Sequence, residues 1–237
     1  GASWFGLSAV TLGWCLIIYG FAASVLPVWL LLAPRDYLST FMKVGTIALL
    51  AVGILIARPV MQAPAVSEFA SSGQGPVFAG SLFPFLFITI ACGALSGFHS
   101  LIASGTTPKM LEKESQMRLI GYGGMMTESF VGIIALITAA ILNQHLYFTL
   151  NAPAAQTGST AATAAEYVNN LPLTGDPITP EQITQAAEDV GEESIISRTG
   201  GAPTLAIGMS EVLHRVFGGT GLKAFWYHFA IMFEALF

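Results

Sequence analysis

Apolar residues are gathered into long runs along the chain, separated by shorter polar segments. The runs fall at about 7–32, 40–58, 81–102, 119–143 and 222–237. Because about 20 consecutive apolar residues cross a bilayer as a helix, the pattern predicts an all-α, polytopic transmembrane helix bundle. The last run stops before it is long enough to cross, so we expect a truncated span and an internal piece of a longer membrane protein.

Prolines and charged residues divide the first two runs. Pro27 lies inside the first run and is expected to kink its helix. Pro34-Arg35-Asp36-Tyr37 follows as a predicted charged turn. The second run has 14 residues between Lys43 and Arg58, so both cations must extend toward the membrane interfaces if it crosses. Residues 59–80, rich in proline and glycine, are predicted to form a loop.

The longest polar segment, residues 144–200, is strongly acidic, with seven carboxylates and one cation. Its Ala/Thr-rich first part, Ala152 to Ala165, is predicted to be mobile. Thr179-Pro180-Glu181-Gln182 has the residue order of a helix start, and Gly191 is a helix stop. These signals predict a short helix within the loop.

Residues 203–217 have the spacing of an amphipathic helix, with Glu211, His214 and Arg215 on its polar side. About 15 residues are too few to span a bilayer, so the segment is predicted to be re-entrant or to lie at the interface. Arg198, followed by Gly200-Gly201, is a candidate anion-binding turn.

The composition agrees with the membrane class. The chain is 54% hydrophobic and 10% charged, against roughly 25% charged residues in soluble domains. Cys15 and Cys92 both lie in apolar runs, which argues against a disulfide framework and against a thiolate metal site. No basic stripe suggests a nucleic-acid partner, so the lipid bilayer is the expected surrounding.

The formal net charge of −5 is unevenly distributed. Arg58 and Arg198 share one predicted side of the bundle with the acidic loop. The opposite side holds five cations, which are Arg35, Lys43, Lys109, Lys113 and Arg118. Because cytoplasmic loops are enriched in Lys and Arg, we expect these five in the cytoplasm and residues 144–200 outside it.

The third run differs from an ordinary lipid-facing helix. Its second half is rich in glycine and hydroxyl residues, which predicts a broken helix that lines a polar cavity. Ser96, His99 and Ser100 are candidate substrate-binding or proton-binding residues. Ser104 is a candidate ligand for an anionic group, together with backbone N–H groups freed at the break. The alternatives are interhelical hydrogen bonding by His99 and an ordinary cap and turn after the helix.

Glu128 lies near the middle of the fourth run. A charged group at mid-bilayer costs at least about 2.5 kcal/mol. The residues that share the helical face of Glu128 are Gly121, Gly124, Met125 and Gly132. We predict that this face points into the bundle and that Glu128 handles the coupling proton or binds a cation. The alternative is a structural acid that hydrogen-bonds to a neighbouring helix.

Glu234 is a second predicted intramembrane acid and a candidate ion-binding residue. Its depth is left open because the last run is truncated. Tyr227 shares its helical face, whereas His228 lies about 120° away from it around the helix. The two therefore do not form a natural metal pair, and no metal site is predicted. His228 either takes part in a site or lies at the interface beside Phe225 and Trp226.

Five ordered motifs extend over nearly the whole chain. They are Leu26–Leu38 (Leu26-Pro27-Val28-Trp29 through Pro34-Arg35-Asp36-Tyr37-Leu38), Gly93–Lys109 (Gly93-Ala94-Leu95-Ser96-Gly97-Phe98-His99-Ser100 through Gly105-Thr106-Thr107-Pro108-Lys109), Ile120–Met125, Ser197–Thr204 and Trp226–Glu234. Together they resemble the carbon starvation protein A family of bacterial inner-membrane transporters. The Ala/Thr-rich part of the acidic segment matches poorly.

This resemblance implies a multi-span transporter that is induced during carbon starvation and imports peptides. It also implies a leucine-transporter-like fold of the amino acid–polyamine–cation type, with broken helices. Close relatives implicated in pyruvate uptake make a pyruvate–proton symporter the alternative. We therefore expect a secondary active transporter of the bacterial inner membrane, coupled to protons or sodium and without a cofactor. The remainder of the full-length transporter is its expected partner.

Two other function classes are alternatives to transport. Ser96 and His99 resemble a hydrolase dyad, but the residues around Ser96 do not form the Gly-x-Ser-x-Gly elbow and no carboxylate lies close in sequence. The chain is therefore not expected to be an enzyme. A nutrient sensor that binds without moving its ligand stays open, as do the substrate, the coupling ion, the oligomeric state and a contact between His99 and Glu128.

Overall fold

The computed structural model describes residues 8–27, 30, 32–80, 83, 104–105, 107–219 and 221–236. Within these ranges the chain is helical, without a strand, and a single isolated bridge joins Gln74 and Ala79. The helices are α1 (Ala9–Val25), α2 (Leu32–Ala57), α3 (Phe69–Ser72), α6 (Thr107–Met110), the 3-10 helix η3 (Glu114–Gln116), α7 (Met117–Ala140), α8 (Gln144–Asn151), α9 (Ala154–Thr157), α10 (Ala161–Asn169), α11 (Pro180–Val190), α12 (Ala202–Phe217) and α13 (Leu222–Leu236).

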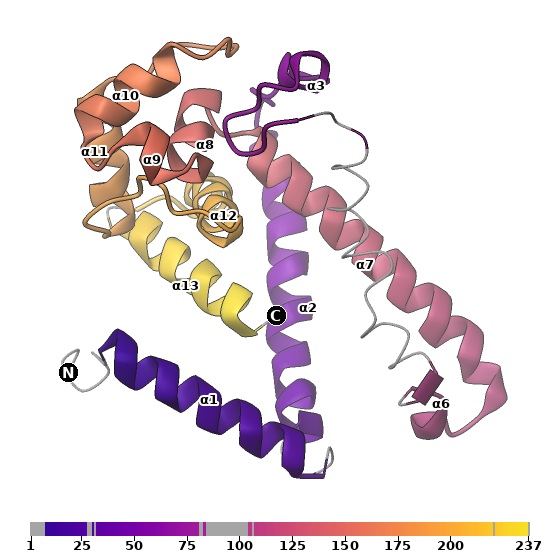
Figure 1. Ribbon diagram of the computed structural model, residues 1–237. Coiled ribbons are helices and arrows are strands. Elements are labelled where there is room, and N and C mark those ends of the chain that lie inside the picture. Colours follow the sequence, from indigo (N-terminus) through magenta and orange to yellow (C-terminus); the bar gives the residue numbers. More distant parts are fainter. Residues whose placement is uncertain are drawn as a thin grey trace.

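The two long helices, α2 and α7, converge at their C-terminal ends and separate toward their N-terminal ends (Figure 1). The backbone N–H groups of Gln62 and Ala63, just after α2, donate to the Ala140 carbonyl at the end of α7, at 2.8 and 3.0 Å. Residues Tyr37–Ala57 and Glu114–Ala140 are each long and apolar enough to cross a membrane. The described part is therefore all-α with two candidate membrane-spanning helices.

Two sequence predictions about the first helices are corrected. Pro27 does not kink α1, because the helix ends at Val25 and Leu26 is already extended, as favoured for a residue before proline. Pro34-Arg35-Asp36-Tyr37 is not a turn but lies in the first part of α2. Pro34 is the third residue of that helix, and the first four N–H groups of a helix have no intrahelical partner.

Helices α8 to α11 form a compact group at the C-terminal ends of α2 and α7 (Figure 1). Here the Ala/Thr-rich stretch 152–165, predicted to be mobile, instead holds α9 and the start of α10, with Ala164 and Ala165 buried. A capping box between Thr160 and Thr163 starts α10. Helix α11 has the predicted start, with Thr179 as its cap, and Gly191 ends it in a left-handed conformation.

Helix α12 is largely enclosed by other helices of the described chain. It packs on α2, α7, α8 and α13, and eight of its 16 residues are buried. Two glycines permit the close approach, since a β-carbon at Gly53 of α2 would lie 3.2 Å from Val212, and one at Gly208 of α12 would meet the α7 backbone at Thr138. Helix α12 therefore contacts both candidate membrane spans.

The N-terminal half of α7, most of α2 and all of α1 carry large exposed apolar side chains. Among them are Trp14, Ile18, Phe41, Leu55, Tyr122 and Met126. The buried core lies instead where α8–α13 meet the C-terminal halves of α2 and α7. So large an exposed apolar surface suits contact with lipid or with further protein.

Candidate functional site

A pocket of about 220 Å³ lies where α2, α7, α12 and α13 meet. Its described lining is apolar except for one hydroxyl, that of Thr46, whose side chain is buried. The lining residues are Thr46, Ile47, Leu50, Val131, Ile134, Ala135, Leu205, Met209 and Phe233. We call this space the four-helix pocket. An apolar pocket with few polar groups is the usual form of a small-molecule site.

The four-helix pocket extends from mid-depth toward the joined ends of both candidate spans. Thr46 is 11 residues before the end of α2, and Val131 is nine before the end of α7. At 1.5 Å per residue these positions are about 16 and 14 Å from the joined helix ends. Half of a bilayer's hydrocarbon core is about 15 Å, so in a membrane crossed by these helices the deep end of the pocket would lie near the centre.

Glu128 lies on the same face of α7 as the pocket lining. It precedes Val131 by three residues and Ala135 by seven, spacings that align side chains along one side of a helix. The axial step to Val131 is about 4.5 Å. The Glu128 side chain is exposed in the described structure. The arrangement therefore gives a carboxylate about one helical turn from the pocket.

Glu234 lies on α13 next to Phe233, whose side chain lines the four-helix pocket. Both predicted intramembrane acids are thus on helices that form this pocket, Glu128 on α7 and Glu234 on α13. The Glu234 side chain lies outside what the structure describes. Its predicted face-sharing neighbour Tyr227 is almost fully buried.

The broken-helix candidates fall mostly outside the described residues. Ser96, His99 and Ser100 are in the undescribed range 84–103, as is any contact between His99 and Glu128. Ser104 is described and exposed, within a short stretch of π-type turn that precedes α6. Their predicted roles stay predictions.

A charged cluster that sequence reasoning missed joins three helices. Lys223 Nζ at the start of α13 lies 3.4 Å from Asp189 Oδ2 of α11 and 3.1 Å from Glu211 Oε2 of α12. Arg215 Nε pairs with the other Glu211 oxygen at 3.1 Å. The sequence signal for this cluster was a single lysine, Lys223, at the start of an apolar run. The cluster ties the α8–α11 group to the α12–α13 hairpin.

Arg198 does not form the predicted open anion-binding turn. One of its nitrogens pairs with Glu192 at 2.8 Å, and its Nε donates to the Ser194 carbonyl at 3.2 Å. The guanidinium is thus engaged by groups of its own loop. The following Gly200 and Gly201 both have positive φ, which continues the turn into α12.

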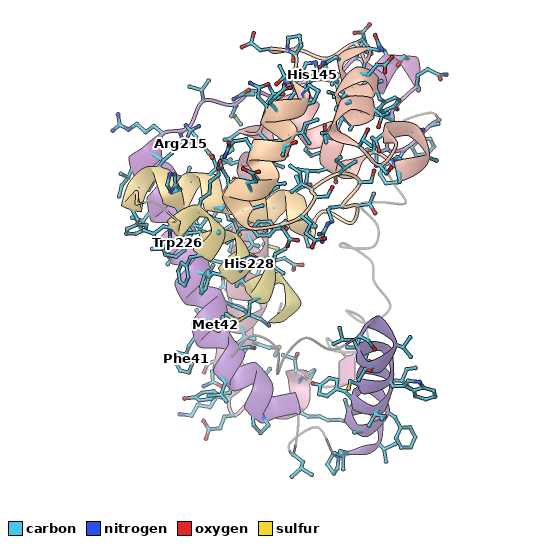
Figure 2. The ribbon with its side chains drawn as sticks, turned by 90° about the vertical axis from the view of Figure 1, so that its left-hand side faces the viewer. Phe41, Met42, His145, Arg215, Trp226 and His228 are labelled. Atoms are coloured by element: carbon cyan, nitrogen blue, oxygen red, sulfur yellow. The ribbon has the colours of Figure 1, made fainter. Side chains whose placement is uncertain are left out.

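Trp226 and His228 lie on opposite sides of α13 (Figure 2). The Trp226 ring stacks obliquely on Phe217 of α12, with centroids 5.5 Å apart. His228 faces the end of α11, where a β-carbon at Gly191 would lie 3.4 Å from its Nε2. Within the described residues, no group of three His, Cys, Asp or Glu side chains is arranged to hold a metal ion.

Known proteins resemble this chain along its whole length. The sequence profile of the family described as carbon starvation protein CstA matches residues 1–237. The peptide transporter CstA of Mycobacterium tuberculosis H37Rv is 79% identical over 237 residues, covering the whole chain and 31% of that protein. The Escherichia coli K12 peptide transporter CstA is 59% identical over 241 residues, covering the whole chain and 34% of that protein.

A relative with a different named substrate also matches. The pyruvate/proton symporter BtsT of Escherichia coli K12 is 49% identical over 246 residues, covering 96% of the chain and 34% of the relative. The chain thus spans about a third of the length of these relatives, all of which are named as transporters. No solved structure matches the chain.

Proposed function

Because the chain belongs to the carbon starvation protein CstA family, we propose that it forms part of a proton-coupled transporter that imports peptides across the bacterial inner membrane during carbon starvation. The name of the 79% identical relative, a peptide transporter, supports peptide over pyruvate as the substrate. The 49% identical pyruvate/proton symporter supports coupling to protons.

One structural observation carries the proposal. A carboxylate, Glu128, lies at mid-span on the same face of α7 as a pocket formed by four helices. Transporters bind substrate and coupling ion close together near the middle of the membrane. An acid beside the pocket binds and releases a proton, and this changes the charge of the site. Substrate binding then depends on whether the acid is protonated, so proton binding and substrate binding are linked.

The full-length protein is proposed to adopt a leucine-transporter-like fold of the amino acid–polyamine–cation type. The support is the family resemblance of the glycine-rich third run, together with helix α12, which is enclosed by α2, α7, α8 and α13. Such folds contain two repeats of opposite topology with broken helices at the binding site. A structure of the full-length protein tests this, and one without an inverted repeat would contradict it.

Transport is tested with the full-length protein in proteoliposomes. Labelled diglycine or leucylglycine is expected to accumulate when the outside is made acidic and not when the pH gradient is collapsed. Labelled pyruvate in place of dipeptide would support the alternative symporter. Binding of dipeptide without any accumulation would indicate a sensor and overturn the transport proposal.

The role of Glu128 is tested by Glu128→Gln, which keeps the shape of the side chain and removes its charge. We expect gradient-driven accumulation to be lost while exchange of labelled for unlabelled dipeptide persists. The matched control is Glu114→Gln, the same change at an exposed residue of η3, just before α7. Full proton-driven accumulation by Glu128→Gln would contradict the assigned role.

A further inference from the structure

The four-helix pocket is smaller than the usual site for a whole peptide-sized ligand. Its volume of about 220 Å³ is below the roughly 300–1,000 Å³ of sites that enclose a drug-sized ligand. It is large enough for one side chain, since an apolar cavity of about 150 Å³ already accommodates benzene.

The lining chemistry restricts what can enter. The described lining residues carry no charge, and Thr46 has the single hydroxyl. A small carboxylate such as pyruvate would lose its hydration there without an ion-pairing partner, which is strongly unfavourable. An aliphatic or aromatic group would instead contact Leu50, Ile134, Met209 and Phe233. Its transfer from water into this apolar space is favourable.

From this pairing of pocket and acid, we infer that the four-helix pocket is a specificity subsite that receives one apolar side chain of a peptide substrate. The Glu128 carboxyl, one turn away on the same face of α7, donates a hydrogen bond to a peptide carbonyl when it is protonated. A peptide carbonyl and the side chain of its residue are close together in any peptide, so both can be engaged at once. The inference rests on the proposed peptide transport.

Residues on two sides of the pocket limit the size of the group that fits. Ala135 of α7 contributes a small side chain, so a larger one there would occupy the space itself. Ile47 of α2 lines the opposite side and is partly buried. Shortening it would enlarge the pocket with less loss of packing than a change at fully buried Leu50.

The test uses the full-length transporter in proteoliposomes and compares uptake of leucylglycine with uptake of diglycine. We expect the wild-type protein to prefer leucylglycine by roughly tenfold to a few hundred-fold, the discrimination typical of apolar pockets. Ala135→Phe is expected to bring the ratio close to one by lowering leucylglycine uptake more than diglycine uptake. The matched control, Ile133→Phe, changes an exposed position of the same helix and is expected to keep the wild-type ratio.

A second variant tests the subsite in the opposite direction. Ile47→Ala is expected to raise uptake of tryptophylglycine relative to leucylglycine at least severalfold, whereas Leu55→Ala at an exposed position of α2 leaves that ratio unchanged. A retained leucylglycine preference in Ala135→Phe would overturn the inference alone. If Ala135→Phe transports neither dipeptide, the Ile47→Ala variant decides. An unchanged ratio of tryptophylglycine uptake to leucylglycine uptake in that variant overturns the inference. Failure of the wild-type protein to move any dipeptide would instead overturn the proposed transport.

Discussion

Gly208 of α12 lies directly against the main chain of α7 at Thr138. A β-carbon at Gly208 would fall 2.9 Å from the Thr138 carbonyl carbon and still closer to its oxygen. The contact holds the enclosed helix α12 against a candidate membrane span. It explains why a glycine is needed in the middle of a helix, where glycine is otherwise unfavourable.

Gly208→Ala is expected to push α12 from α7 and lower the free energy of unfolding by about 1–3 kcal/mol, the usual cost of overpacking. Thermal melting of the purified full-length protein measures the change. Gly45→Ala on α2 is the control, since a β-carbon added there would have nothing within 4 Å of it. Equal melting temperatures for the two variants would contradict the close contact.

The buried hydrogen bond between α8 and α12 gives a second prediction. Asn151 Nδ2 donates to Thr204 Oγ1 at 2.7 Å, and both residues are buried. Thr204→Val removes the acceptor, so we expect a loss of about 1–2 kcal/mol of stability. Thr184→Val, at an exposed hydroxyl that bonds only within α11, is expected to cost much less. Comparable losses at the two positions would count against the role of the interhelical bond.

The charged cluster around Lys223 is expected to contribute modestly, because its side chains are 24–45% exposed. Lys223→Met should lower stability by at most about 1 kcal/mol. A double-mutant cycle with Glu211→Gln measures the coupling, and 1 M salt should weaken it. Arg215→Met is the comparison, since it removes only the Arg215–Glu211 pair within one helix. A zero coupling energy at low salt would contradict the proposed tie between α12 and α13.

His145 predicts how stability depends on pH. Burial lowers the pKa of its imidazole, and the Asp176 charge partly opposes this shift. The folded protein therefore binds fewer protons at this site than the unfolded chain. Stability is highest above the ordinary histidine pKa of about 6.5 and is lost as the pH falls through the lower folded pKa.

Chemical denaturation between pH 8 and pH 5 measures this dependence in the full-length protein. His145→Gln is expected to flatten the decline below about pH 6.5. Asp176→Asn is expected to deepen it, because the charge that favours the imidazolium is lost. An unaltered slope in both variants would exclude His145 as the source.

Local chemistry made some elements predictable. The limits of α11 follow from Thr179, Pro180 and Gly191, whose capping and backbone preferences need no distant partner. The apolar runs likewise mark α2 and α7. Hydrophobicity alone misplaced the end of α1, because the constraint on the residue before Pro27 acts on the backbone and not on polarity.

Composition was a poor guide to the Ala/Thr-rich stretch. Alanine is both a strong helix former and small enough to be buried at a helix contact, so Ala164 and Ala165 support α10 where low complexity suggested mobility. The Thr160 cap was the local signal that could have corrected the prediction. A helix cap indicates a stable helix only where tertiary packing also stabilises that helix.

The sequence by itself determined the membrane character, the family and an acid at mid-span, because hydropathy, motif order and residue depth are properties of the chain alone. Only the tertiary structure decided that α2, α7, α12 and α13 enclose a pocket beside Glu128, and that Lys223 joins three helices. The physical reason is that both arrangements unite residues of different helices, 187 positions apart for Thr46 and Phe233 in the pocket and 34 apart for Lys223 and Asp189 in the cluster. Such contacts depend on close approach of helices, through glycines such as Gly208, that no local pattern specifies.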